Sequence, residues 1–235
     1  MKWPHLFIAL IPVASLLAGS GGPVAPEALV NSYQNASREQ SVRLRGASME
    51  VDIEASLPKL QKHGRLHALR RISRLGRVTY ESLLFEGDNT IRNSVIARYV
   101  AGETQGQWNE GALAISPANY KFKYKGLSDH DGRQLHVFQL TPRKKRVGLF
   151  KGELWLDAET CLPLRESGRF VKSPSIFLRR IEFIRDYEIR DGVAIPREID
   201  STVETRIVGK AELTVRFHNV SLAENPAFTI AASGE

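Results

Sequence analysis

Hydrophobic and polar residues alternate along most of this chain, which is the pattern of strands that bury one face. The clearest run is 49–57, in which every odd residue is apolar and every even residue is polar. Similar runs predict further strands at 67–73, 77–85, 120–125, 134–141, 147–156, 163–171, 176–189, 193–203 and 211–220. Because Asp131-Gly132 and Asp191-Gly192 are tight-turn signals between such runs, and no crossover helix is predicted beyond residue 120, we expect one antiparallel sheet.

Helical periodicity is confined to the first half of the chain. Apolar residues recur at three- and four-residue steps over 27–40, directly after Pro26. Asp88 can cap a second helix that runs to about residue 101, and a helical turn is predicted at 110–115. The expected fold class is therefore α+β and mostly β, with two or three helices against a curled sheet. By alternation, the inner face of that sheet carries Met49, Val51, Ile53, Tyr120, Phe122, Tyr124, Ile181, Phe183, Tyr187, Leu213, Val215 and Phe217. The result is either a packed core or an apolar cavity beneath a helical lid.

The first twenty residues have the pattern of an export signal. Lys2 precedes the apolar segment 6–17, and the small residues Ala18-Gly19-Ser20 follow it. Ser20 stands where a bacterial lipoprotein would carry its lipidated cysteine, so we expect cleavage after Ser20 and a soluble, exported, periplasmic protein. The alternative is an uncleaved membrane anchor. The predicted organisation is a signal peptide at 1–20, a flexible leader at 21–26 and a single domain at 27–235.

The chain of 235 residues has a formal net charge of +7, and its basic residues are spread along the sequence. The strongest charge run is Arg143-Lys144-Lys145-Arg146, at a predicted hairpin tip. This run could contact anionic lipid headgroups or an envelope protein, or it could be a solvated turn. Export argues against nucleic acid as the partner. The lone cysteine, Cys161, excludes an internal disulfide and a Cys-x-x-Cys redox pair.

Catalytic motifs are not apparent in the sequence. It contains no phosphate-binding loop, no dinucleotide fingerprint and no nucleophile elbow, and its histidines lack metal-ligand spacing. Ser128-Asp129-His130 is interpreted as a solvated loop. An acid cluster around Glu153 and Asp157 leaves a hydrolase as an alternative, but alternation and turn chemistry favour a hairpin in which Asp157 bonds nearby amides. We therefore expect no catalytic residue, no metal and no cofactor.

The same hairpin carries a family resemblance. The run Gly-Glu-Leu-Trp-Leu-Asp-Ala-Glu-Thr-x-Leu-Pro-Leu at 152–164 resembles a strand-turn-strand of the LolA/LolB-like outer-membrane lipoprotein-sorting superfamily, which includes RseB-type sensors. The later Asp-Gly-Val-x-x-Pro at 191–196 and Val-x-Phe-x-x-Val at 215–220 are similar in kind.

The resemblance implies an unclosed β-barrel whose concave apolar face is covered by helices and holds acyl chains. The expected function is that of a non-enzymatic, monomeric carrier of lipid or lipoprotein acyl chains in outer-membrane lipoprotein trafficking; an RseB-type envelope sensor is the alternative. Candidate wall residues for the acyl chain are Phe122, Tyr124, Trp155, Phe183, Tyr187 and Phe217.

Overall fold

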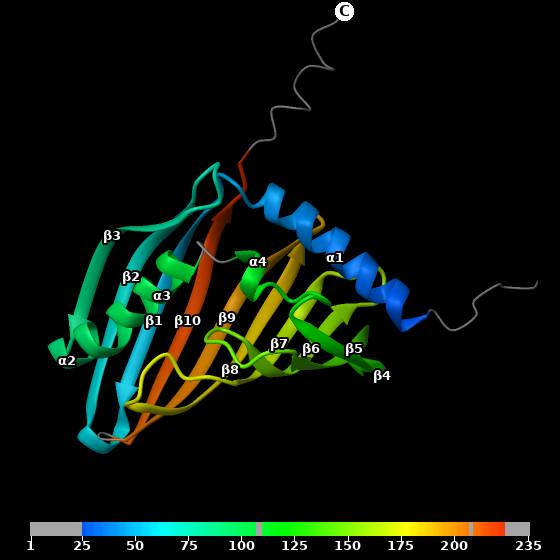
Figure 1. Cartoon of the computed structure of the whole chain (residues 1–235). Coiled ribbons are helices and arrows are strands. Elements are labelled where there is room, and N and C mark those ends of the chain that lie inside the picture. The colour runs from blue at the N-terminus through cyan, green and yellow to red at the C-terminus, as the bar shows by residue number, and fades with distance from the viewer. Residues whose placement is uncertain (1–24, 107–109, 207–208, 224–235) are drawn as a thin grey trace, which may run out of the picture.

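The computed structural model describes residues 25–106, 110–206 and 209–223. The predicted signal peptide lies outside these residues. Within them, ten strands form one antiparallel sheet in the order β3-β2-β1-β10-β9-β8-β7-β6-β5-β4. The strands are β1 (Ser48–Leu57), β2 (Lys62–Ile72), β3 (Val78–Gly87), β4 (Tyr120–His130), β5 (Arg133–Pro142), β6 (Phe150–Asp157), β7 (Pro163–Phe170), β8 (Leu178–Arg190), β9 (Val193–Thr205) and β10 (Lys210–Ser221). The sheet curls but ends at β3 and β4, so it is an unclosed barrel as predicted (Figure 1).

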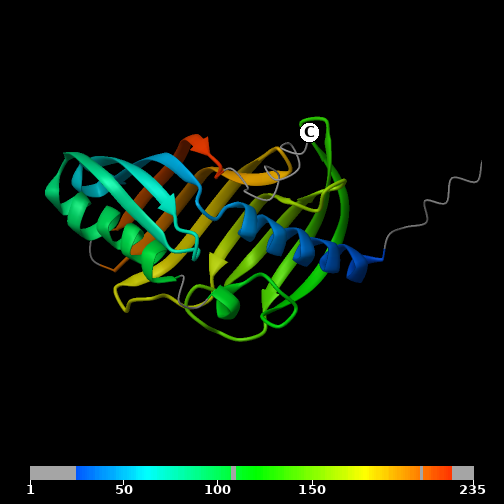
Figure 2. The ribbon, with the colours of Figure 1, turned by 90° about the horizontal axis from the view of Figure 1, so that it is seen from above.

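The helices of the described residues lie on the concave face of this sheet (Figures 1 and 2). The first, α1 (Pro26–Arg43), crosses the half of the sheet that ends at β4. A continuous helical segment made of α2 (Asn89–Ile91), the π-helix η2 (Arg92–Ile96) and α3 (Ala97–Gly106) covers the other half, and α4 (Glu110–Leu113) is a single turn. The Asp88 carboxylate accepts a hydrogen bond of 2.6 Å from the Thr90 amide, which confirms the predicted cap.

Two tight turns fix the register of the hairpins that the sequence predicted. Asp131 and Gly132 have φ of +53° and +75°, and Asp191 and Gly192 have φ of +52° and +67°. Positive φ at both central residues is the type I′ geometry, whose twist matches that of the flanking strands. These turns join β4 to β5 and β8 to β9.

Two strands are longer than predicted, and one predicted loop is absent. Strand β2 begins at Lys62, because a short 3₁₀ turn, η1 (Pro58–Leu60), returns the chain directly onto β1. Strand β4 continues through a bulge at Gly126 to His130. The predicted solvated loop at 128–130 is therefore wrong, since these residues pair with β5 at the end of the edge strand.

The hydrophobic core consists of two separate clusters. The α3-side cluster packs apolar residues of β1, β2, β9 and β10 beneath Ile91 and Ile96. The α1-side cluster packs residues of β4 to β8 and the adjoining turns against Leu29, Val30 and Tyr33 of α1. Of the predicted inner-face residues, those that are buried are Met49, Val51, Ile53, Tyr120, Phe183, Leu213, Val215 and Phe217. The concave face is thus filled at both ends, and its middle is where a site can lie.

Candidate functional site

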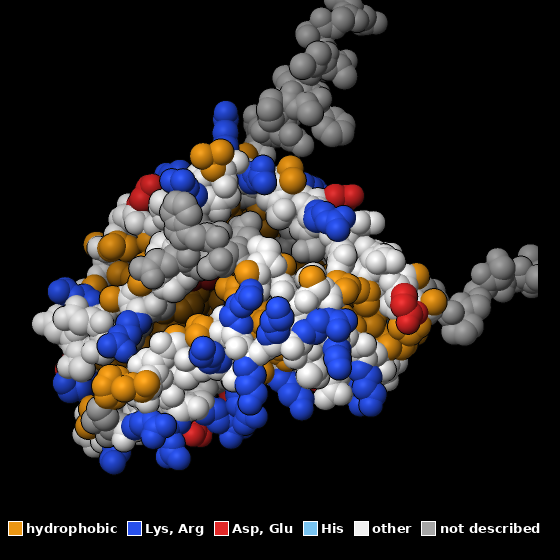
Figure 3. All heavy atoms as spheres, viewed as in Figure 1, with side chains coloured by type: hydrophobic (Ala, Val, Ile, Leu, Met, Phe, Trp, Pro, Cys, Tyr) orange, Lys and Arg blue, Asp and Glu red, His pale blue; other side chains and the backbone are white. Residues whose placement is uncertain are grey.

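A hollow opens on the concave face between the two helical covers. Figure 3 shows it between α3 and the segment that carries α4, with hydrophobic side chains on its floor and Lys and Arg side chains around its rim. Apolar side chains at the margins of the two clusters remain only partly buried. They are Ile72, Tyr80, Phe85, Val95, Tyr99, Val100, Val203 and Val220 on one side, and Leu113, Ile115, Phe122, Tyr124, Phe170 and Val171 on the other.

The structure places five of the six predicted wall residues on the concave face, divided between the two ends. Phe122 packs edge-to-face on Phe138 at a centroid distance of 6.0 Å. Tyr124 also contacts Phe138, and its hydroxyl lies 2.9 Å from Nδ1 of His136. These two residues and Phe183 belong to the α1 side, Phe217 belongs to the α3 side, and Tyr187 lies between them.

Trp155 lies on the opposite, convex face. Its strand neighbours Leu154 and Leu156 are buried in the α1-side cluster, so alternation directs the indole away from that cluster. There its Nε1 donates to Glu153 at 3.0 Å, and its ring meets His130 edge-on at 5.7 Å. We therefore leave Trp155 out of the lipid-binding surface considered below.

A charged cluster that sequence reasoning missed lies on the concave face near the middle of the sheet. The Glu166 side chain, on β7, is only 8% exposed and accepts hydrogen bonds from Arg185 Nη1 at 3.0 Å and from the Tyr187 hydroxyl at 3.1 Å. Arg185 is paired with Ile199 of the α3-side cluster in register, and its guanidinium lies 5.9 Å from the ring of Phe183 in the α1-side cluster. Arg185 therefore sits at the junction of the two clusters.

A second such cluster lies beneath α3. Arg70 on β2 donates from Nε and Nη2 to the Glu103 carboxylate at 3.3 and 3.1 Å, and the Tyr80 hydroxyl donates to the same oxygen at 3.4 Å. The hydroxyl of Tyr99 is buried and has no hydrogen-bond partner among the described residues. Burial raises the pKa of Tyr99 well above its ordinary value, and the charge of Glu103 raises it further.

We group the two clusters, together with Tyr33 of α1, under the name polar seam. Its members are Tyr33, Arg70, Tyr80, Tyr99, Glu103, Glu166, Arg185 and Tyr187. The pKa of Arg185 is raised by Tyr187 and, against the effect of burial, by Glu166 and also by Glu103 of the other cluster. Burial raises the pKa of Tyr33 on α1, and the charge of Glu166 adds to the effect. Charges that influence one another in this way share a low-dielectric region.

The predicted basic run at 143–146 is exposed between β5 and β6, but its four side chains differ in role. Arg143 Nε donates to the Pro117 carbonyl oxygen at 2.7 Å, and Arg146 Nη1 donates to that of Ala112 at 3.3 Å. These arginines fix the segment around α4. Lys144 and Lys145 form no hydrogen bond or ion pair with described residues, so they are the members of the run available to a partner.

The acid-and-thiol hairpin is structural, as the sequence indicated. The Asp157 carboxylate accepts from the amides of Glu159 and Thr160, at 3.3 and 2.9 Å, and from the Thr160 hydroxyl at 2.7 Å. Cys161 is buried in the α1-side cluster, and burial raises the pKa of its thiol, an effect to which Asp157 adds. The carboxylates that a hydrolase would use thus have structural hydrogen bonds.

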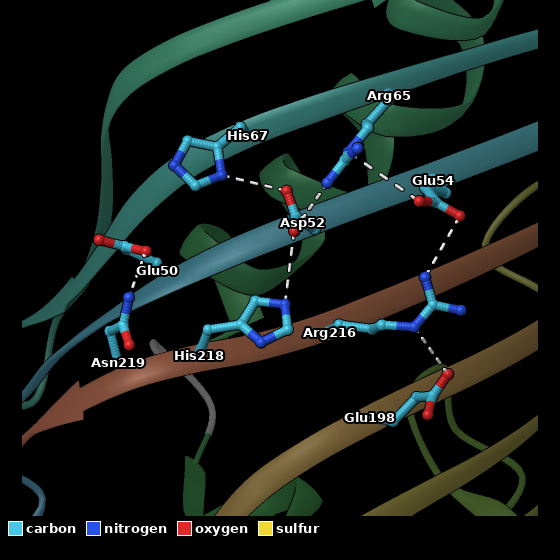
Figure 4. Close-up of polar contacts among 9 residues, drawn as sticks. All are labelled: Glu50, Asp52, Glu54, Arg65, His67, Glu198, Arg216, His218 and Asn219. Carbon is cyan, nitrogen blue, oxygen red and sulfur yellow. Dashed lines mark hydrogen bonds and ion pairs between the residues drawn. The ribbon is translucent and has the colours of Figure 1, made fainter.

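The convex face of β2, β1, β10 and β9 carries a network of exposed and half-buried charges (Figure 4). Asp52 contacts Arg65 at 2.9 Å, His67 at 3.0 Å and His218 at 3.4 Å. Burial alone would raise the pKa of Asp52, but hydrogen bonds from His67 and Arg65 outweigh that effect and lower it. Arg216 bridges Glu54 and Glu198 at 3.3 Å each. These cross-strand pairs stabilise the strand register on a solvated face.

A cleft of about 460 Å³ lies at one end of this network. Its lining includes Glu54, His63, Arg65, Glu86 and Glu212. In the described part of the chain, no group of three or more His, Cys, Asp or Glu side chains is arranged to hold a metal ion.

None of the helices in residues 25–106, 110–206 and 209–223 is long and apolar enough to cross a membrane.

No family model and no curated protein sequence matches this chain. Its fold is similar to a DUF1329 family protein from Desulfovibrio piger, which is 12% identical with a TM-score of 0.46 over 86% of this chain and 95% of that one. It is also similar to a LolA superfamily protein from Nitrosomonas europaea, with 12% identity and a TM-score of 0.41 over 84% of this chain and 95% of that one. A third similar structure is an outer membrane lipoprotein-sorting protein domain from Vibrio parahaemolyticus, with 12% identity and a TM-score of 0.40 over 86% of this chain and 98% of that one. The structures to which this chain is similar thus include the LolA-like and lipoprotein-sorting kinds that its sequence resembles.

Proposed function

We propose that this protein is a non-enzymatic carrier that binds an acyl chain of a lipid or lipoprotein in the concave hollow. The observation that supports the proposal is the division of the core. Two apolar clusters are each packed beneath their own helix, and further apolar side chains that pack against each cluster remain only partly buried. An acyl chain in the hollow would cover such side chains and remove their apolar surface from water.

The energy available from this arrangement is sufficient for useful affinity. Each buried methylene contributes about 0.8 kcal/mol, so a twelve-carbon chain gains roughly 10 kcal/mol before the cost of association, which is at least about 4 kcal/mol. The remainder corresponds to binding in the micromolar range or weaker. Reversible binding of this strength is what a carrier requires.

A bulky side chain on the concave face tests the proposal. Val203 on β9 is half-buried against the α3-side cluster, whereas its neighbour Thr202 points to the other face of the same strand. We expect Val203→Trp to weaken displacement of a fluorescent fatty acid at least about tenfold, and Thr202→Trp to leave it unchanged. Native mass spectrometry of the purified wild type should show bound acyl species. Equal binding by the two variants, or no binding by the wild type, contradicts the proposal.

A second candidate function is that of an envelope sensor or interaction module that binds a protein partner. The exposed, unpaired Lys144 and Lys145 support it, because a partner with an acidic surface could contact both. Lys144→Glu together with Lys145→Glu should abolish capture of that partner from an envelope extract. Reversal of the exposed Lys121 and Lys123 on β4 is the control for the change in net charge. An unchanged set of captured proteins argues against this function.

The remaining features of the carrier proposal concern location and assembly. We propose an exported, periplasmic, monomeric protein whose single domain follows a cleaved signal peptide. Mass spectrometry of the protein secreted to a bacterial periplasm should give a chain that begins after Ser20. An intact N-terminus associated with the membrane fraction would support an anchor instead.

A further inference from the structure

We propose that the polar seam binds the carboxylate head of a single-chain amphiphile, so that the head lies inside the concave face and the acyl chain occupies the adjoining hollow. This inference rests on the proposed carrier function and specifies its ligand class. It is carried by the hydrogen-bonding state of two side chains, Arg185 and Tyr99.

Arg185 has an unused pair of donors suited to a carboxylate. Its Nη1 serves both Glu166 and Tyr187, whereas Nε and Nη2 form no hydrogen bond with described residues. Although protein groups from β7, β8 and α3 surround it, 36% of its side-chain surface remains accessible on the concave face.

Two other arginines of this protein show what that pair of donors binds. Arg165 holds Asp186 through Nε at 2.8 Å and Nη2 at 3.2 Å, and Arg70 holds Glu103 through the same two nitrogens. The Nε–Nη2 edge of a guanidinium matches a planar carboxylate in a bidentate pair. Arg185 presents this edge without a protein carboxylate on it.

Tyr99 supplies a second donor to the seam. Its hydroxyl is buried and lacks a hydrogen-bond partner among the described residues. Burial raises its pKa, and the charge of Arg185 opposes that rise. A buried polar group without a partner destabilises the ligand-free protein. In the proposed complex, the carboxylate accepts from Tyr99 as well as from Arg185, which gives this hydroxyl a function.

The charge balance of the seam favours a single negative charge. Arg70 is held by Glu103 and Arg185 by Glu166, so the four groups together are neutral. The additional negative charge of a ligand is met by the unused donors of Arg185 and by the Lys and Arg side chains around the rim (Figure 3). A cationic head has no unpaired carboxylate there to bind.

Displacement titrations with dodecanoate, dodecanol, dodecylamine and dodecyl phosphate test the inference, because these probes share one chain and differ in the head. Wild-type protein should bind dodecanoate about tenfold more tightly than dodecanol, and dodecylamine most weakly. Arg185→Met should abolish the preference for dodecanoate. Arg197→Met, which removes an exposed arginine on β9, should preserve it.

Tyr99→Phe provides a test that does not depend on the stability of the Arg185 variant. Because the hydroxyl has no partner, its removal should leave the melting temperature of the ligand-free protein unchanged or raised, and it should weaken dodecanoate binding several-fold. Tyr120→Phe, which removes a hydroxyl that accepts from the Phe150 amide, should leave dodecanoate binding unchanged.

The possible outcomes separate this inference from the carrier function. If neither dodecanoate nor dodecanol binds, the carrier function itself fails. Equal affinities for the two probes leave the carrier function standing but overturn the head site, as does unchanged dodecanoate binding by Tyr99→Phe. A tighter, Arg185-dependent affinity for dodecyl phosphate would reject the carboxylate in favour of a phosphate head.

Discussion

Removal of the Glu166 carboxylate should be among the most damaging single changes on the concave face. The side chain is 8% exposed and accepts from Arg185 at 3.0 Å and Tyr187 at 3.1 Å. Breaking a buried ion pair by deleting one partner costs about 3–5 kcal/mol, because the other charge remains desolvated. Since 36% of the Arg185 side chain is accessible, solvent relieves part of that cost. We expect Glu166→Ala to lower the free energy of unfolding by about 2–3 kcal/mol.

Urea unfolding followed by circular dichroism measures this loss, with Glu182→Ala as the matched control. Glu182 forms an ion pair with Arg180 in which both side chains are nearly half exposed, so its removal should cost less than about 1 kcal/mol. The double variant Glu166→Gln with Arg185→Met should recover most of the stability lost by Glu166→Ala, because no uncompensated charge is left.

Two results would refute this reasoning. Equal losses from Glu166→Ala and Glu182→Ala would mean that the seam is solvated like the surface. A double variant as unstable as the single one would mean that the loss arises from packing and not from the charge on Arg185.

Three further predictions follow from other parts of the fold. A Cβ on Gly152 would lie 1.8 Å from the Ser167 carbonyl oxygen, so Gly152→Ala should lower the free energy of unfolding by at least about 3 kcal/mol. The control is Gly102→Ala on α3, where a Cβ would meet open space. In the same urea assay this variant should raise the free energy of unfolding by up to about 1 kcal/mol. Burial lowers the pKa of His136 in the folded protein, so the unfolded chain binds more protons as the pH falls. The stability that depends on the neutral ring is therefore complete above about pH 6.5, the ordinary pKa of histidine. It is lost as the pH falls below that value toward the lower pKa of the folded state. Unfolding midpoints of wild type and His136→Gln between about pH 7 and pH 5 should therefore converge as the pH falls. Burial raises the pKa of the Cys161 thiol, so a thiol reagent should label the folded protein far more slowly than the urea-unfolded chain, and equal rates would contradict the burial of this residue.

The sequence predicted the local structure well, because alternation and turn chemistry act over a few residues. The strand at 49–57, the Asp88 cap and the two Asp-Gly turns all formed as expected. The pairing of β1 with β10, which joins distant parts of the chain, could not be deduced because an alternating strand does not encode its partner. Alternation with its neighbours Leu154 and Leu156 predicts that Trp155 lies on the other face of the sheet. Trp155 was nevertheless predicted as a wall residue because its side chain is aromatic.

The polar seam was missed although a signal for it exists. Arg185 occupies the same alternation phase as Ile181, Phe183 and Tyr187, and Arg70 occupies that of Leu66, Ala68 and Ile72. A charged residue in the apolar phase of a strand is unusual and indicates either a partner or a function. What the sequence alone could not supply is the partner, because Glu166 and Glu103 reach these arginines from another strand and from a helix.

Paramagnetic broadening by a spin-labelled fatty acid, recorded on the isotope-labelled protein, tests most directly whether the acyl chain lies in the concave hollow. An acyl chain in the hollow should strongly broaden the Val203 methyl and Phe217 ring signals, which lie on the concave side. The indole N–H signal of Trp155, on the convex face, should remain sharp. Broadening of the Trp155 signal with sharp Val203 and Phe217 signals would mean that the acyl chain does not lie on the concave face.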